Sequence, residues 1–359
     1  MSSITTSQTS ELTDPKLRAI GKRVLRMLQL EAEKAVAHHA EPANFPIDPN
    51  SAEQIFLARF KELTPTKQKA ATEKTMFSVK SPEATRAQFY GDLSKVDLHK
   101  NTAVEAQVNA LGLPATLKLP ESHLRSLTQL HGQILESHLA AAVAAAGEIA
   151  PANITNKLEL RIHKVKCVDE TDPEFWGDDE ISLGGTTVDE SGDVSKVSVF
   201  VVKNDFDDGE QQIYSPPKRF TSFNLMGGTT FPKSYFVTLV LAETDMGSHF
   251  ADFISKLSEK VKAKVLQLVA AAVGAAIGST VPGIGTIVGA VTGWVMANVF
   301  EYLKGLFGDD VFKPVTVSIN IPSLNTRWSG GKTDSPEGVV TFKGYGGTYQ
   351  LTYDWRLFA

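Results

Sequence analysis

The sequence predicts an α+β protein in which an N-terminal helical domain, residues 1–150, precedes an antiparallel β-sandwich, residues 156–359. A hydrophobic helical hairpin at 248–308 is expected to interrupt the sandwich. Three observations predict this fold. Helix-capping signals recur through the N-terminal part, runs that alternate apolar and polar residues follow it, and residues 265–300 contain no charged side chain.

The N-terminal part contains repeated helix starts, each with a short polar residue that can cap a helix. They are Asp14-Pro15, Asn50-Ser51, Thr64-Pro65 and Ser81-Pro82. After the first start, Leu17, Ile20, Val24 and Leu28 recur at helical spacing. A last helix is expected over residues 121–146, followed by a linker at 149–155.

From residue 156 the periodicity changes to two, which is typical of strands with one buried face. Strands are expected at 158–165, 196–202, 235–241, 315–321, 338–342 and 347–353. Short strands at this spacing indicate an antiparallel sandwich. The hydrophobic segment falls between two of them, so we expect it to be an insertion in a loop.

The charge-free segment reads as two arms joined by a turn. Lys264 is the last charge before it, and Pro282-Gly283 divides it in the middle. At the helical rise each arm would be about 25 Å long, whereas the hydrocarbon core of a bilayer is about 30 Å thick. Each arm alone is therefore of borderline length for a membrane span.

Glycines recur along both arms at multiples of four residues within each arm. They are Gly274, Gly278, Gly285, Gly289 and Gly293. In lipid, such a stripe of small residues lets helices pack closely, whereas in water each glycine costs a helix about 1 kcal/mol relative to alanine. The pattern favours membrane insertion, but a hairpin buried permanently in protein or an assembly interface would have a similar composition.

The flanks of the hairpin suit a membrane surface. Lys260, Lys262 and Lys264 precede the first arm and could contact anionic head groups. Trp294 in the second arm could anchor at the interface. Because each arm is short, permeabilisation would require a homo-oligomer packed through the glycine faces.

Acidic residues gather in loops near the expected sandwich. Residues 169–210 contain 14 Asp and Glu side chains and two Lys. The candidate ligands for a hard cation are Asp169, Asp178 and Asp179 in a first loop, with Glu243, Asp245 and Asp252 after a later strand. Calcium takes six to eight oxygen ligands from such flexible loops. The alternative is a solvated acidic surface.

This arrangement resembles the calcium-dependent phospholipid-binding C-two domain. In that family, loops at one end of an eight-stranded sandwich hold calcium against lipid phosphates. The resemblance implies that Asp169 and Asp178 or Asp179 come from the first loop, and that Glu243, Asp245 and Asp252 come from the third. It covers at most residues 156–358, Glu243 replaces a usual Asp, and the glycine-zipper hairpin is foreign to the family.

Other classes of function lack a signal. No basic groove with interleaved aromatic residues indicates a nucleic-acid partner. Gly330-Gly331-Lys332-Thr333 lacks the first glycine of a phosphate loop, because Thr326 stands there. Cys167 is the single cysteine, and acidic neighbours would raise its pKa, which disfavours a reactive thiolate. We therefore predict that the chain is not an enzyme.

The N-terminus has no basic start and no apolar run, so a chain made in the cytoplasm without a signal peptide is expected. The sequence predicts a membrane-active protein, such as a pore-forming toxin or effector, that docks through its sandwich and inserts the hairpin after non-classical secretion. The alternative is a non-enzymatic assembly protein, such as cargo of an export or injection machine, with the hairpin permanently buried.

Overall fold

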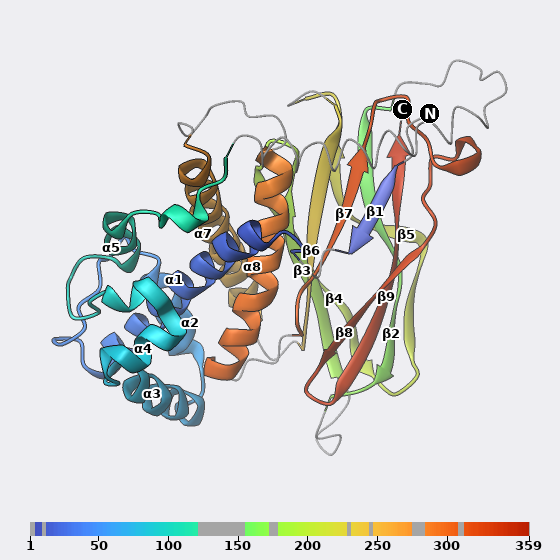
Figure 1. Cartoon of the computed structure of the whole chain (residues 1–359). Coiled ribbons are helices and arrows are strands. Elements are labelled where there is room, and N and C mark those ends of the chain that lie inside the picture. The colour runs from blue at the N-terminus through green and yellow to red at the C-terminus, as the bar shows by residue number, and fades with distance from the viewer. Residues whose placement is uncertain are drawn as a thin grey trace.

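The structure is a computed structural model of the chain. The residues that it describes are 4–8, 12–120, 155–171, 179–227, 231–243, 247–274, 284–307 and 312–358. Helices occupy one side of the molecule and two antiparallel sheets the other (Figure 1). The predicted α+β class is confirmed.

The N-terminal helices form a module that is built around one long helix. Their bounds are α1 Pro15–Ala40, α2 Glu53–Glu62, α3 Pro65–Val79, α4 Glu83–Tyr90 and α5 Val104–Leu111, with 3-10 turns η1 Gly91–Lys95 and η2 Ala115–Leu117. All four expected starts lie within two residues of an observed helix. The Asp14 carboxylate accepts hydrogen bonds from the backbone amides of Lys16 and Leu17, both at 2.9 Å. The helix expected over 121–146 lies outside the described residues.

The strands form two sheets. Their bounds are β1 Thr5–Gln8, β2 Lys157–Asp169, β3 Asp179–Val188, β4 Val194–Phe206, β5 Gln211–Asn224, β6 Lys233–Glu243, β7 Val315–Ile321, β8 Gly338–Gly344 and β9 Gly347–Phe358. Sheet A has the order β1-β7-β6-β3-β4, and sheet B has the order β5-β2-β9-β8. Every pairing of these strands is antiparallel.

Three strands differ from the expectation. The first strand, Thr5–Gln8, pairs with β7, so the start of the chain belongs to sheet A and not to the helical domain predicted over 1–150. β5 contains Pro216 and Pro217, which an edge strand tolerates because one side of it needs no hydrogen bonds. β3 contains Gly184 and Gly185, and these weakened its strand signal.

The hydrophobic segment is an insertion between two neighbouring strands, as expected. It contains α7, Gly247–Val273, and α8, Ile284–Phe307, which we call the hairpin. The hairpin leaves sheet A after β6 and returns at β7, and these two strands pair directly. In space it lies between the N-terminal helices and sheet A, with sheet B beyond (Figure 1).

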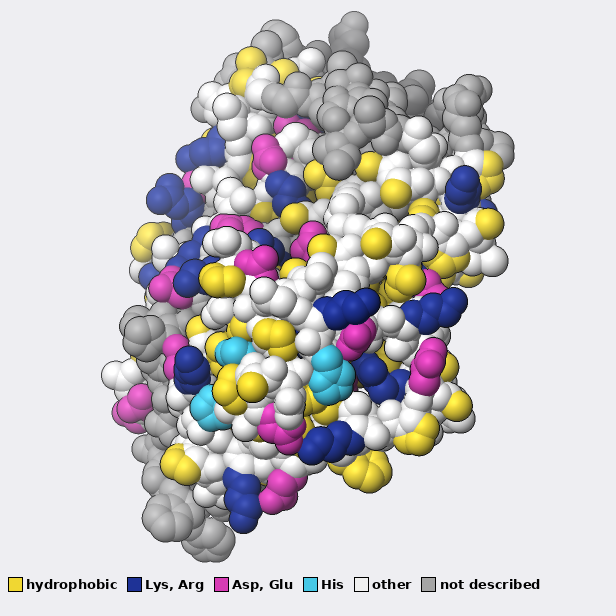
Figure 2. Space-filling model, turned by 90° about the vertical axis from the view of Figure 1, so that its left-hand side faces the viewer, with side chains coloured by type: hydrophobic (Ala, Val, Ile, Leu, Met, Phe, Trp, Pro, Cys, Tyr) yellow, Lys and Arg dark blue, Asp and Glu magenta, His cyan; other side chains and the backbone are white. Residues whose placement is uncertain are grey.

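Two large hydrophobic cores lie on opposite faces of sheet A. On β6, Tyr235, Val237, Leu239 and Leu241 point into the sandwich core, whereas Val240 and Ala242 belong to a core that the hairpin shares with α1, α2 and α3. A smaller core joins α1 to α4, η1 and α5. The outward face of the N-terminal module carries basic, acidic and apolar side chains interspersed (Figure 2). The buried apolar residues of α1, α2 and α3 that belong to the shared core pack toward the hairpin.

Candidate functional site

The second helix of the hairpin is buried almost all round. Its buried side chains are Ile287, Val288, Val291, Thr292, Val295, Met296, Ala297, Val299, Phe300, Leu303 and Leu306. They face α1 and α3 on one side and β6 and β7 on the other, and α7 packs beside them. A helix that is apolar on all sides is typical of a protein interior or of a membrane. In this structure two separate parts of the chain supply the interior.

Two of the predicted glycines let α8 approach sheet A closely. A Cβ atom at Gly289 would lie 2.3 Å from the Phe236 ring of β6, and one at Gly293 would lie 2.9 Å from Thr316 Oγ1 of β7. No side chain fits at such distances without displacing its neighbour. The four-residue glycine spacing thus serves packing of α8 against a sheet in this state.

Trp294, next to Gly293 in the sequence, contacts α1 instead of sheet A. A Cβ atom at Gly21 would lie 2.8 Å from Trp294 Cε3, so the absence of a side chain at Gly21 makes room for the indole. The indole is partly buried in this interface. The predicted membrane anchor is therefore packed against the N-terminal module in this state.

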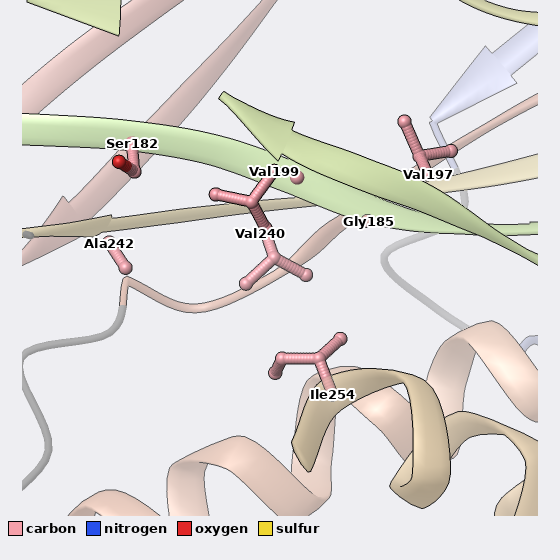
Figure 3. A pocket seen from close by; sticks show the side chains of 8 residues that line it. Ser182, Gly185, Val197, Val199, Val240, Ala242 and Ile254 are labelled. Carbon is pink, nitrogen blue, oxygen red and sulfur yellow. The ribbon is translucent and has the colours of Figure 1, made fainter. Parts of the chain in front are cut away.

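The first helix of the hairpin fits less tightly against sheet A. Ile254 of α7 points toward Val240 and Val199, and a small pocket of about 20 Å³ that opens to solvent lies between them (Figure 3). Its lining consists of Ser182, Gly184, Gly185, Val197, Val199, Val240, Ala242 and Ile254. The contact of α7 with the sheet thus leaves space, whereas that of α8 leaves none at Gly289 or Gly293.

A buried ion-pair cluster joins α7 to the N-terminal module. Lys264 and Glu31 of α1 are both fully buried, and Lys264 Nζ lies 2.8 Å from Glu31 Oε1. Lys264 also donates a hydrogen bond to Glu105 of α5, which is one-third exposed. Glu53 of α2 acts on Glu31 through its charge. Lys34 of α1, whose charge acts on Glu53, donates to the carbonyl oxygens of residues 100 and 102 at 2.7 and 2.9 Å.

Burial shifts the protonation of this cluster. Desolvation raises the pKa of Glu31 from 4.5 to about 7, although Lys264 opposes the shift. Burial disfavours the Lys264 ammonium, but the carboxylates of Glu31 and Glu105 outweigh it and raise the pKa of Lys264. Lys264 thus stays charged at neutral pH, while Glu31 titrates near neutrality.

The three lysines proposed as head-group ligands have different environments. Lys264 is inside the protein and cannot meet a head group in this conformation. Lys262 Nζ lies 3.0 Å from an oxygen of the exposed Asp193 carboxylate, in the β3–β4 turn. Lys260 is partly exposed. Only Lys260 and Lys262 are placed at the surface of the folded chain.

The structure divides the candidate calcium ligands. Asp179 is buried and accepts hydrogen bonds from the Thr171 amide at 2.9 Å and the Thr171 hydroxyl at 2.6 Å. Glu243 Oε2 lies 3.3 Å from the same hydroxyl. Asp252 of α7 instead pairs with Lys196 at 2.8 Å, near the other end of the β3–β4 ladder. Asp179 and Glu243 thus come together through Thr171, and Asp252 lies elsewhere.

The remaining candidates add little to such a site. Asp169 is exposed at the end of β2, and Asp178 and Asp245 lie outside the described residues. Within the ranges that the structure describes, no group of three or more His, Cys, Asp or Glu side chains could hold a metal ion. Calcium binding by the acidic loops stays a prediction.

We expect Asp179→Asn to lower the free energy of unfolding by about 1–3 kcal/mol, because an amide cannot accept all the hydrogen bonds that this buried carboxylate receives. Tyr349 is the third donor. Urea unfolding with a chelator and with added calcium measures the cost, and we expect the same cost in both. Asp169→Asn on the exposed end of β2 is the matched control. Stabilisation of the original chain by calcium that Asp179→Asn removes would instead support an ion site.

Several hairpin positions are only partly described. Gly274 directly follows α7 with φ +74°, a conformation that favours glycine, and Gly285 lies in the first turn of α8. Gly278, Pro282 and Gly283 lie outside the described residues.

The buried charges of α1 were not found from the sequence. Glu31, Glu33 and Lys34 resemble ordinary charged residues of a surface helix, yet all three are buried. The one signal in the sequence was the length of the helix expected there. In the structure, the buried residues of α1 occupy more than one face of the helix. A helix surrounded on all sides must pair the charges that it carries.

Cys167 agrees with its sequence interpretation. Its side chain is fully buried in the sandwich core, and desolvation raises the pKa of the thiol to about 11. Tyr349 opposes this shift through a hydrogen bond, and the Asp179 charge adds to it. The thiol is therefore protonated at neutral pH and is a poor nucleophile.

None of the helices within the described residues is both long enough and apolar enough to cross a membrane.

Neither the family models, nor the curated proteins, nor the solved structures matched this chain. The C-two resemblance therefore rests on its residues alone, and the two-sheet sandwich is the part of it that the structure contains.

Proposed function

We propose that the protein is membrane-active and that the structure is its stored state, in which the hairpin is covered until it meets lipid. The observation that carries this proposal is the position of α8. Its apolar surface is covered on one side by the N-terminal module and on the other by sheet A, and these are parts of the chain outside the hairpin. Separation of either part would expose an apolar helix, for which lipid is a favourable environment.

The glycine stripe supports the same function because it allows close packing both against sheet A and against another helix in lipid. In the stored state Gly289 and Gly293 pack against Phe236 and Thr316. Once α8 leaves the sheet, the stripe is free to pack against another helix in lipid, where small residues allow close contact. Because each arm is short, several chains would insert together as a homo-oligomer.

The surface lysines of α7 give a first contact with lipid. Lys262 is held by an exposed carboxylate, Asp193, and such pairs contribute little to stability. An anionic membrane can therefore compete with Asp193 for Lys262, while Lys260 adds a second positive charge nearby. Docking in this proposal needs no calcium, because it uses these two lysines.

A reversible cross-link between α8 and β7 tests the proposal. The pair Gly293→Cys and Thr316→Cys suits a disulfide, since a Cβ atom at Gly293 would lie 3.2 Å from Thr316 Cβ, a few tenths of an ångström below the usual range. We expect the oxidised variant to release no more dye from anionic liposomes than buffer does. Reduction should restore leakage. Cys167 is fully buried and so interferes little.

The controls separate the effect of the disulfide from the effect of the two substitutions themselves. Thr316→Cys alone should leak like the original chain, whereas Gly293→Cys alone and the reduced double variant report what a side chain at Gly293 does to the packing. Parallel samples with millimolar calcium or a chelator test whether the ion matters. Equal leakage from the oxidised and reduced forms would contradict release of the hairpin. Calcium-dependent leakage would add the acidic loops to the mechanism.

The second candidate is a non-enzymatic assembly protein with a permanently buried hairpin. One observation favours it: the core shared by α1, α2, α3 and the hairpin is continuous, so release exposes apolar residues of α1 as well. This candidate predicts no association with liposomes of any composition, in either redox state of the cross-linked variant.

A further inference from the structure

The start of the chain connects the two large cores of the molecule. β1 is the last strand of sheet A and pairs with β7, where Ser7 lies opposite Ser318 (Figure 1). Ile4, directly before β1, is buried in the sandwich core. Leu12, a few residues after β1, is buried instead in the core that the hairpin shares with the N-terminal module. We call residues 4–8 together with Leu12 the clasp.

Leu12 lies in the contact between α1 and α8. A Cβ atom at Gly21 of α1 would lie 3.6 Å from Leu12 Cδ1 and 2.8 Å from Trp294 Cε3 of α8, so both side chains pack over the same glycine. The Arg18 guanidinium of α1 also donates a hydrogen bond from Nε to the Leu12 carbonyl oxygen at 2.8 Å. Leu12 is therefore fixed to the first turns of α1 and moves with the module.

The chain between the two ends of the clasp is short. Four Cα–Cα steps separate Gln8, the last residue of β1, from Leu12, and they span at most about 14 Å when fully extended. While β1 stays on β7, the start of α1 is held within about this distance of sheet A. A module that moves farther from α8 must therefore pull β1 off β7. The same limit applies if the hairpin and the module leave sheet A together.

We propose that β1 is an inhibitory clasp, which holds the N-terminal module on α8 and must leave β7 before the hairpin is uncovered. This inference rests on the proposed storage of the hairpin and adds its control. β1 suits this role because it is a four-residue strand at the edge of a sheet. Such short edge elements open at a lower free energy than the central strands of a sheet.

A removable cross-link between β1 and β7 tests the clasp. Serine and cysteine are similar in size, so we combine Ser7→Cys with Ser318→Cys, which are opposite residues of the ladder. A short bifunctional methanethiosulfonate joins the two thiols, and reductant removes it. We expect hydrogen exchange of α8 amides in the lipid-free full-length chain to slow by about tenfold or more and to recover on reduction. The same variant with a monofunctional methanethiosulfonate is the control.

A second variant loosens the clasp without changing α1 or α8. Ile4→Asp would place a carboxylate in the sandwich core, so β1 should detach more often and α8 amides should exchange about tenfold faster or more. Thr6→Asp, at an exposed position of the same strand, is the matched control and should exchange like the original chain. Peptides of β2 and β9 are the internal reference for an intact sandwich.

The outcomes separate the clasp from the proposed function. Exchange of α8 that stays unchanged under either the cross-link or Ile4→Asp overturns the clasp, whatever these variants do to liposomes. Slower exchange with the cross-link and faster exchange in Ile4→Asp, without leakage from any variant, support the clasp and reject the membrane function. The same exchange results, together with leakage that the cross-link prevents and Ile4→Asp accelerates, support both.

Discussion

Lys264→Met is expected to lower the free energy of unfolding by about 3–5 kcal/mol at about pH 8, because the substitution leaves the buried Glu31 carboxylate without its cation. Both side chains are fully buried, so water cannot replace the lost partner. The loss should be smaller at about pH 5.5, where Glu31 is protonated. Urea unfolding followed by tryptophan fluorescence and circular dichroism measures both values.

Two further variants check the cause of this loss. Lys262→Met makes the same change two residues earlier on α7, where the partner Asp193 is exposed, and should cost less than about 1 kcal/mol. Glu31→Leu combined with Lys264→Met removes both charges and should recover most of the stability. Equal losses at positions 262 and 264 would show that the buried pair contributes nothing special.

Gly289→Leu is expected to cost about 2–3 kcal/mol, because its Cβ atom would overlap the Phe236 ring of β6. Phe236→Ala alone should cost about 3–4 kcal/mol by leaving a cavity. The double variant places the new leucine in the vacated space, so its loss should be at least about 1 kcal/mol smaller than the sum of the single losses. Thermal and urea unfolding of the four chains give this coupling.

Ala271→Leu is the control, since it adds the same side chain at an exposed position of α7. It should leave stability within about 0.5 kcal/mol of the original chain. Additive losses at Gly289 and Phe236 would contradict the close contact between α8 and sheet A. The same contact means that leucine substitutions along the glycine stripe alter the stored state before any lipid is present. Their effect on leakage therefore needs this stability measurement beside it.

The helix starts and the hairpin insertion could be predicted because their signals are local. A capping residue such as Asp14 bonds to amides two and three positions away, and an alternating run such as 315–321 carries its own periodicity. β1 and β5 could not be predicted in this way. Thr5–Gln8 is a strand because β7 pairs with it, and β5 keeps two prolines because it lies at an edge.

The sequence marked several residues around the hairpin as candidates, but it did not show what they contact in the folded chain. The glycine spacing predicted that α8 packs closely against another element. Only the folded chain shows that Gly289 and Gly293 lie against Phe236 and Thr316. The acidic pattern predicted Asp179 and Glu243 as candidate ligands of one site. In the structure both carboxylates contact the hydroxyl group of Thr171. The sequence could not reveal the pairing of Glu31 with Lys264, because the two residues are far apart in the chain and each resembles an ordinary surface charge.

The sequence by itself determined the fold class, the position of the charge-free hairpin and its insertion between two strands, since composition and periodicity act over a few residues. The tertiary structure decided what covers that hairpin and how it is held. Burial alone turns Lys264, Glu31 and Glu105 into a coupled cluster, because the desolvation that raises the pKa of Glu31 exists only when α1, α5 and α7 are packed together.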